Sequence, residues 1–125
     1  MMDSERSAAI NIGGKEYELI LTTRATKAIA GRYGGLENLE MALDEIIWLI
    51  TLLANQSILI QNLRNKNSPE ELLTEEEVEI LTTPFDLAAY KNAITEAMFK
   101  GTKRNVESEE DSVTGGAVSK NVEVG

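Results

Sequence analysis

The 125-residue sequence contains no cysteine and no histidine. Without cysteine the chain has no disulfides, no thiolate nucleophile and no cysteine-ligated zinc. Without histidine it lacks the commonest general base and the commonest metal ligand. We therefore expect a protein that is not an enzyme and that has no catalytic residues, no metal ion and no cofactor.

Positive charge is scarce as well, because 12 Lys and Arg residues face 21 Asp and Glu residues and leave a net charge of −9. Affinity for nucleic acids and anionic lipids comes mostly from Lys and Arg, so we expect no nucleic-acid or membrane partner. The longest nearly uninterrupted apolar stretch, residues 46–54, is far shorter than the roughly 20 residues of a membrane span. Residues 1–6 do not resemble a secretory signal peptide, so we expect the protein to stay in the cytoplasm.

A chain of this length has room for one domain. Near its start, apolar residues alternate with others over residues 9–12 and 17–21, on either side of Gly13-Gly14. This pattern predicts a β-hairpin with a two-residue turn, which places Ile10 opposite Tyr17. A lone hairpin is marginal in water, so we expect it to pack against helices.

Helical periodicity begins after the hairpin. Residues 24–33 predict a short helix, with a cap at Thr22-Thr23 and a stop at Gly34-Gly35. From residue 36 to 64 apolar residues recur at steps of three and four, and the opposite side is apolar around Trp48, which is typical of a helix buried nearly all round. The seam consists of Leu36, Leu39, Leu43, Ile46, Ile50 and Leu53. Periodicity leaves open whether 36–64 is one helix or two joined near residues 41–45.

Three capping signals mark further helix starts, at Ser68-Pro69, at Thr74 with Glu77, and at Thr83-Pro84. The first predicts a single helical turn and the second a short helix. The third opens a final helix, which we expect to end at Gly101. The apolar face of this last helix consists of Leu87, Tyr90, Ile94, Ala97 and Met98.

The composition changes after residue 104, because residues 105–125 hold five carboxylates, a single Lys120 and only isolated small apolar residues. Such a segment buries too little to offset the entropy of ordering. We therefore predict an α+β, mostly α fold. Residues 1–104 form an N-terminal β-hairpin packed on a small bundle of about four helices, and residues 105–125 form a disordered acidic C-terminal tail.

Two motifs suggest ligand binding but lack the required pattern. Gly13-Gly14-Lys15 has neither the first glycine nor the Ser or Thr of a phosphate-binding loop, so a hairpin turn is the better interpretation. The six glutamates between residues 70 and 79 lack the Asp, Asn and Gly spacing of a calcium loop. Glutamate is favourable in the first turn of a helix, which explains them as solvated surface.

The remaining signal is surplus apolar surface on the central helix. Trp48, Leu52 and Leu59 lie together at steps of four and seven, opposite much of the apolar seam. We take these three residues as the candidate partner-binding site, with core packing as the alternative for Trp48 itself. The alternative for the whole apolar surface is that the hairpin and the last helix cover it fully. An uncovered stripe of this kind also predicts self-association into a homo-oligomer.

Read in order, these features resemble the short tail assembly chaperones of long-tailed bacteriophages, especially those of Gram-positive hosts. The resemblance spans residues 9–100 and rests on the order and spacing of several segments. They are Gly14-Lys15-Glu16-Tyr17-Glu18-Leu19, Thr22-Thr23-Arg24-Ala25, Arg32-Tyr33-Gly34-Gly35, the entry from Leu36 to Leu43, and Leu73-Thr74-Glu75-Glu76-Glu77-Val78.

This resemblance implies a non-enzymatic protein of the bacterial host cytoplasm. Such a protein binds the tape measure protein, helps to gather the major tail tube protein around it, and is absent from the mature virion. Many members also have a longer product made by a shift of reading frame near the C-terminus. A small acidic inhibitor or antitoxin-like regulator that acts by protein–protein binding is the alternative, and it requires carboxylates arrayed on the folded body.

Overall fold

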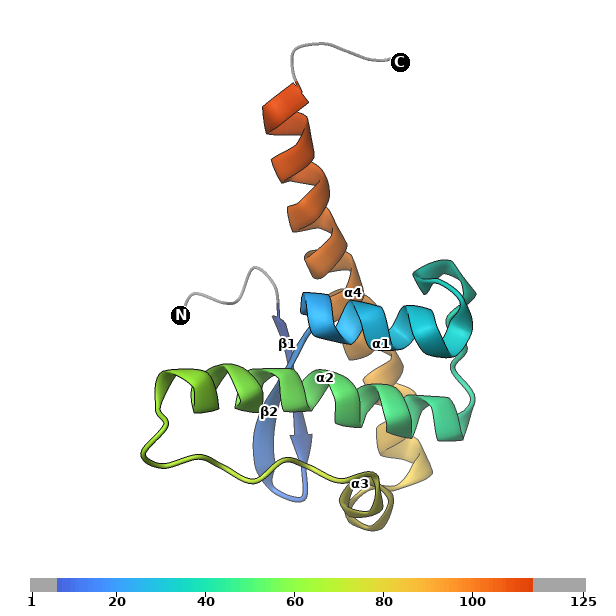
Figure 1. The fold of residues 1–125 in the computed structure, drawn as a ribbon. Helices are drawn as coiled ribbons and strands as arrows, with labels where there is room; N and C mark the ends of the chain where they lie inside the picture. Colours follow the sequence, from blue (N-terminus) through green and yellow to red (C-terminus); the bar gives the residue numbers. More distant parts are fainter. Residues whose placement is uncertain (1–6, 114–125) are drawn as a thin grey trace.

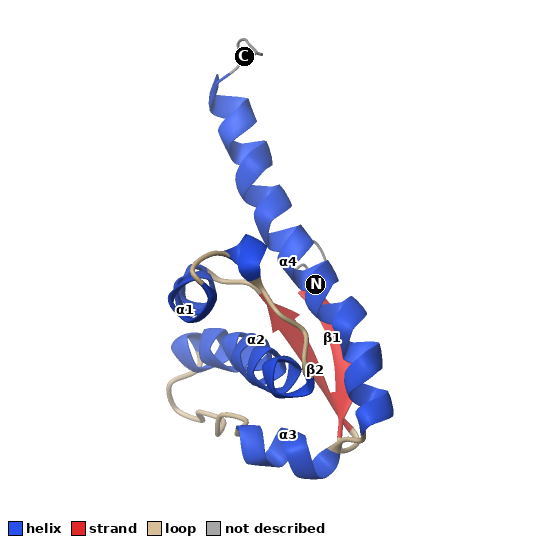
Figure 2. Ribbon diagram, turned by 90° about the vertical axis from the view of Figure 1, so that its right-hand side faces the viewer, coloured by secondary structure: helices blue, strands red, loops and turns tan. Residues whose placement is uncertain are grey.

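The computed structural model describes the backbone of residues 7–113 and the side chains of residues 8–102. In chain order its elements are β1 (Ser7–Ile12), β2 (Lys15–Ile20), α1 (Thr23–Tyr33), the 3₁₀ turn η2 (Leu36–Asn38), α2 (Leu43–Arg64), α3 (Glu75–Leu81) and α4 (Pro84–Val113). The fold is α+β and mostly helical, and its antiparallel hairpin packs against the helices, as predicted. Figure 1 shows α1 lying along α2, and Figure 2 shows the hairpin alongside α2 and α4.

The hairpin has the predicted turn and register. Gly13 and Gly14 occupy the turn with φ of 61° and 87°, values that favour glycine, and Ile10 pairs with Tyr17. The Gly14 N–H donates to the Asn11 side chain at 3.0 Å. One face of the hairpin is buried through Ala8, Ile10, Ile12 and Leu19. This face completes the core that α2 and α4 form.

Helix α2 is the centre of the fold. Ile46, Leu49, Ile50 and Leu53 have no exposed surface, and α2 contacts β2, α3 and α4. By length and composition alone α2 could also cross a membrane, a test that the core helices of soluble proteins pass too. Half of its most apolar window is buried within this fold.

The segment from residue 36 to 64 is neither one helix nor two joined helices. Residues 36–38 form the turn η2, residues 39–42 are not helical, and α2 begins only at Leu43. Leu36 and Leu39 pack against the core from outside the helix. The predicted seam is therefore correct from Ile46 onward, whereas Leu43 is 53% exposed because it stands in the first turn, beyond the core.

The helical turn predicted at Ser68-Pro69 is absent, because two asparagines of α2 hold the chain after α2 extended. Asn55 donates to the Leu73 carbonyl at 2.8 Å and accepts the Leu73 N–H at 2.7 Å. Asn62 donates to the Glu70 carbonyl at 3.1 Å and accepts the Glu70 N–H at 2.9 Å. These four hydrogen bonds satisfy backbone groups that a helical turn would need for itself.

Both other capping predictions are confirmed. The Glu77 N–H donates to the Thr74 hydroxyl at 3.1 Å and the Thr74 N–H donates to the Glu77 carboxylate at 2.9 Å, which is a complete capping box at the start of α3. At the start of α4, the Thr83 N–H donates to Asp86 at 2.9 Å. The predicted apolar face of α4 is buried through Leu87, Tyr90, Ile94 and Ala97, with Met98 partly buried.

The predicted end of the last helix at Gly101 is wrong, because α4 continues to Val113. Gly101 is buried inside the helix, where an added Cβ would lie 2.8 Å from the Leu21 Cβ. The glycine thus allows a close approach between α4 and the chain after β2, and it does not act as a cap. Part of the predicted disordered tail, residues 105–113, therefore has a helical backbone, and residues 114–125 lie outside the described residues.

Candidate partner-binding surface

The start of α1 is fixed over the middle of α2 by one hydrogen-bonded group. The Thr22 hydroxyl caps α1 by accepting the Ala25 N–H at 3.1 Å, and it donates to the Gln56 side chain at 2.6 Å. Gln56 also donates to the Leu52 carbonyl at 3.0 Å and is only 4% exposed. Because both polar ends of this buried amide are satisfied, the N-terminus of α1 is held at one position along α2.

The end of α1 is fixed over the first turns of α2 by aromatic and charged contacts. The rings of Tyr33 and Trp48 pack edge to face with their centroids 6.0 Å apart, and the Arg32 guanidinium lies 4.4 Å from the Trp48 centroid. Arg32 also pairs with Glu45 at 3.0 Å, and the Tyr33 hydroxyl donates to the same carboxylate. Trp48 is consequently covered by side chains of α1.

The same contacts shift the pKa values of Glu45 and Tyr33. The hydrogen bond from Arg32, followed by that from Tyr33, holds the pKa of Glu45 below its usual value. Burial, followed by the hydrogen bond to Glu45, raises the pKa of Tyr33 to about 12. At neutral pH Glu45 is thus charged and Tyr33 is neutral, which are the states that hold α1 over Trp48.

The three residues predicted to bind a partner are all partly buried, but they have different neighbours. Trp48 and Leu52 pack against the core under α1. Leu59 lies beyond the start of α1 and lines an open cleft. The start of α1 at Gln56 therefore lies between Leu59 on one side and Trp48 and Leu52 on the other. A binding role for any of the three stays a prediction.

The cleft beside Leu59 is lined mainly by apolar surface. It has a volume of about 320 Å³, and α2 and the start of α1 enclose it. Its lining consists of Thr22, Arg24, Gln56, Leu59, Ile60, Asn62 and Leu63. We call this cleft the α2 groove. Figure 1 shows the C-terminal part of α2 extending past the N-terminal end of α1.

Sequence reasoning missed most of this lining. Ile60 and Leu63 continue the stripe of Leu52 and Leu59 at helical spacing, and Leu63 is 73% exposed. The signal was the persistence of apolar residues up to Arg64, well past the residues that fill the core. A hydrophobic residue exposed on its own is ordinary, but Leu63 adjoins the partly buried Leu59 and Ile60 in one groove, which makes the three together a candidate contact surface.

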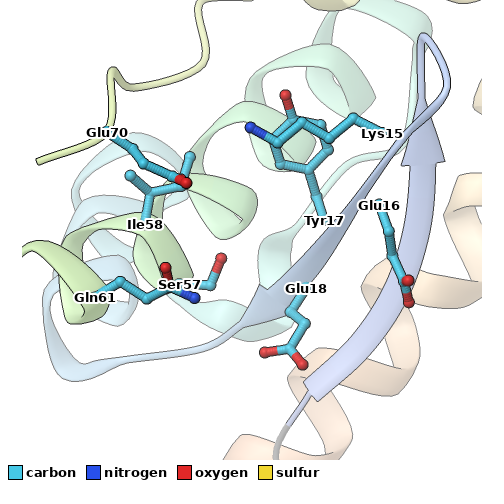
Figure 3. A pocket seen from close by; sticks show the side chains of 8 residues that line it. All are labelled: Lys15, Glu16, Tyr17, Glu18, Ser57, Ile58, Gln61 and Glu70. Carbon is cyan, nitrogen blue, oxygen red and sulfur yellow. The ribbon is translucent and has the colours of Figure 1, made fainter. Parts of the chain in front are cut away.

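A second recess lies on the other side of α2 and is polar (Figure 3). It has a volume of about 340 Å³ and is lined by Lys15, Glu16, Tyr17, Glu18, Ser57, Ile58, Gln61 and Glu70. The Lys15 amine lies 5.3 Å from the centroid of the Tyr17 ring. Three carboxylates border this recess, although among the side chains of residues 8–102 no three acidic groups lie closely enough to hold a metal ion.

Comparisons with protein-family models, curated proteins and solved structures give no match for this chain. The surfaces described above and the resemblance in the order of the sequence segments are therefore the features that bear on function.

Proposed function

We propose that this protein is a tail assembly chaperone of a long-tailed bacteriophage, which binds the tape measure protein in the cytoplasm of the bacterial host. The observation that carries this proposal is the α2 groove, an apolar surface in a fold whose core is already complete. Leu63 is far more exposed than Leu59 beside it, and removing both from water requires a partner.

The groove has the form that suits a helical partner. An amphipathic helix binds a hydrophobic groove through residues spaced three and four apart, and Leu59, Ile60 and Leu63 present such a stripe themselves. A tape measure protein is a long helical chain, so it offers many such faces. The net charge of −9 keeps an assembly of these complexes soluble by like-charge repulsion.

The resemblance supports the same function, because the segments that carry it occur in the fold as a hairpin, a short helix, an apolar helix and a final helix. It also suggests the major tail tube protein as a second partner. Self-association through the α2 groove is expected when no partner is present, since an exposed apolar stripe can pair with a second copy.

Leu63→Asp tests the proposal. The variant should lose capture of the tape measure protein in a co-expression pull-down and should sediment as a smaller species. Its far-UV circular dichroism and thermal midpoint should change little, because Leu63 is 73% exposed in the free protein. Leu52→Asp is a less selective test, because Leu52 packs against the core.

Leu43→Asp is the matched control. Leu43 belongs to the same helix, is 53% exposed and lies outside the groove, so this variant should still capture the tape measure protein. Equal loss of capture in both variants would point to a general effect of charge on α2. Full capture by Leu63→Asp would exclude the groove as the binding site.

One observation favours the alternative function, an acidic inhibitor or antitoxin-like regulator. Glu16, Glu18 and Glu70 border one recess on the folded body, an arrangement that could face a basic surface of a target protein. A Glu16→Lys, Glu18→Lys double variant distinguishes the two functions. It should retain capture of the tape measure protein if the chaperone proposal holds, and an inhibitor would lose its target.

A further inference from the structure

The charge around the α2 groove is opposite to that of the protein as a whole. Arg24 lines the groove, and Arg64 follows Leu63 at the last residue of α2. No carboxylate lines it, although the chain has 21 acidic and 12 basic residues. In the part of the chain that the structure describes, neither arginine is in an ion pair. The groove thus combines an apolar floor with one charged lining residue, the basic Arg24.

The first turn of α1 points to the same charge preference. It contains Arg24 and no acidic residue, whereas the first turns of α2, α3 and α4 all contain one or more. Acidic residues are favourable in the first turn of a helix, so α1 lacks the negative charge that its neighbours supply internally. The N-terminal end of α1, where acidic residues are missing, lies beside the groove, because its cap residue Thr22 is part of the lining.

The arrangement of α1 also sets the direction of an occupant. Helix α1 lies along α2 from Trp48 to Gln56 and begins where the groove begins. In Figure 1 the C-terminal part of α2 continues past that point. A helix placed on Leu59 and Leu63 would therefore lie roughly in line with α1 and would pass beside Arg24.

We propose that the α2 groove binds an amphipathic helix whose apolar stripe is flanked by carboxylates. The apolar side chains of this helix cover Leu59, Ile60 and Leu63, and a carboxylate beside its stripe pairs with Arg24. The inference rests on the proposed function in taking the groove as the partner site. It adds that the partner segment is acidic, although the protein that binds it is itself acidic.

Two designed peptides test the inference. Both have about 18 residues, or five helical turns, with leucines at helical spacing in an alanine-rich background. One has glutamates on either side of the leucines and the other has lysines. Binding of each fluorescein-labelled peptide to the full chain is measured by anisotropy at 0.15 M salt, where the Debye length of about 8 Å screens the distant charges.

The glutamate peptide should bind the wild-type protein about threefold more tightly than the lysine peptide, which is the effect expected of exposed ion pairs. Arg24→Glu should reverse this order. Lys91→Glu, an exposed site on α4 outside the groove, changes the net charge equally and should preserve it. Leu63→Asp should abolish binding of both peptides.

Tighter binding of the lysine peptide to the wild-type protein would overturn the inference, as would equal effects of Arg24→Glu and Lys91→Glu. Failure of both peptides to bind would also overturn it. Failure of this inference can be distinguished from failure of the proposed function. If the charge preference fails while Leu63→Asp still loses the tape measure protein, the chaperone proposal stands without an acidic partner segment.

Discussion

Two glycine-to-alanine substitutions in helices should change stability in opposite directions. Gly31 lies in α1 and Gly101 in α4, and neither has a positive φ. In an exposed helix, alanine is more favourable than glycine by about 1 kcal/mol because the unfolded chain has less freedom to lose. Considered by helix propensity alone, both substitutions would stabilise the protein.

Packing separates the two sites. An added Cβ at Gly31 has no heavy atom within 4 Å, so Gly31→Ala should stabilise by about 0.5 to 1 kcal/mol. An added Cβ at Gly101 lies 2.8 Å from the Cβ and 2.9 Å from the Cδ2 of Leu21. The Leu21 Cβ is fixed to the backbone beside the anchored Thr22, so it cannot move aside as a side-chain end could.

Overpacking of this kind costs about 1 to 3 kcal/mol, which exceeds the gain in propensity. Gly101→Ala should therefore destabilise by about 1 kcal/mol, and the two variants should differ by about 2 kcal/mol. Urea unfolding followed by circular dichroism measures this difference, with an unchanged slope as evidence that the unfolded states are comparable. If Gly101→Ala proved as stabilising as Gly31→Ala, the close approach of α4 to Leu21 would be refuted.

Two further predictions concern the ends of α1. Thr22→Ala removes a helix cap and leaves a buried amide without its partner, so it should cost about 2 kcal/mol in urea unfolding, whereas Thr22→Ser should restore most of the loss. The pKa of Glu45 is lowered by Arg32, so the stabilisation that Glu45 provides is present above its ordinary value of 4.5 and is lost as pH falls through the lowered pKa. Glu45→Gln should therefore make stability less dependent on pH below about 4.5, as followed by Trp48 fluorescence, and an unchanged acid profile would contradict this.

The parts of the fold that were predicted correctly have local causes. The hairpin follows from a Gly-Gly pair between alternating residues, and the starts of α3 and α4 follow from threonines whose acidic partners lie three residues later. In each case the decisive hydrogen bonds join residues that are close in sequence. Such signals are readable before any tertiary contact is known.

The incorrect predictions depended on contacts between distant residues. Gly101 resembles a helix stop until the position of Leu21 is known, since a glycine serves equally as a cap and as a site of close approach. Ser68-Pro69 resembles a helix start, but Asn55 and Asn62 bind the following backbone in an extended form. Both asparagines are distant enough in sequence that no local pattern connects them with this segment.

The sequence pattern indicated only part of the candidate site, because the remaining part again depends on a contact between distant residues. Periodicity placed Trp48, Leu52 and Leu59 on one side of α2, but it contained no information on where α1 begins above that side. The structure gives the position through the contact of Thr22 with Gln56. Leu59 is thereby separated from the two residues that α1 covers.

The length of α1 therefore determines which part of the apolar stripe is available to a partner. Its end is held at Trp48 and its start at Gln56, so it covers the stripe between these points and none beyond them. Folding requires only the covered part, since the core is complete without Leu63. A polar residue at position 63 would leave the folded state almost equally stable and would lower the tendency to aggregate. Folding therefore does not account for the exposed Leu63, whereas the partner-binding role proposed for the α2 groove would account for it.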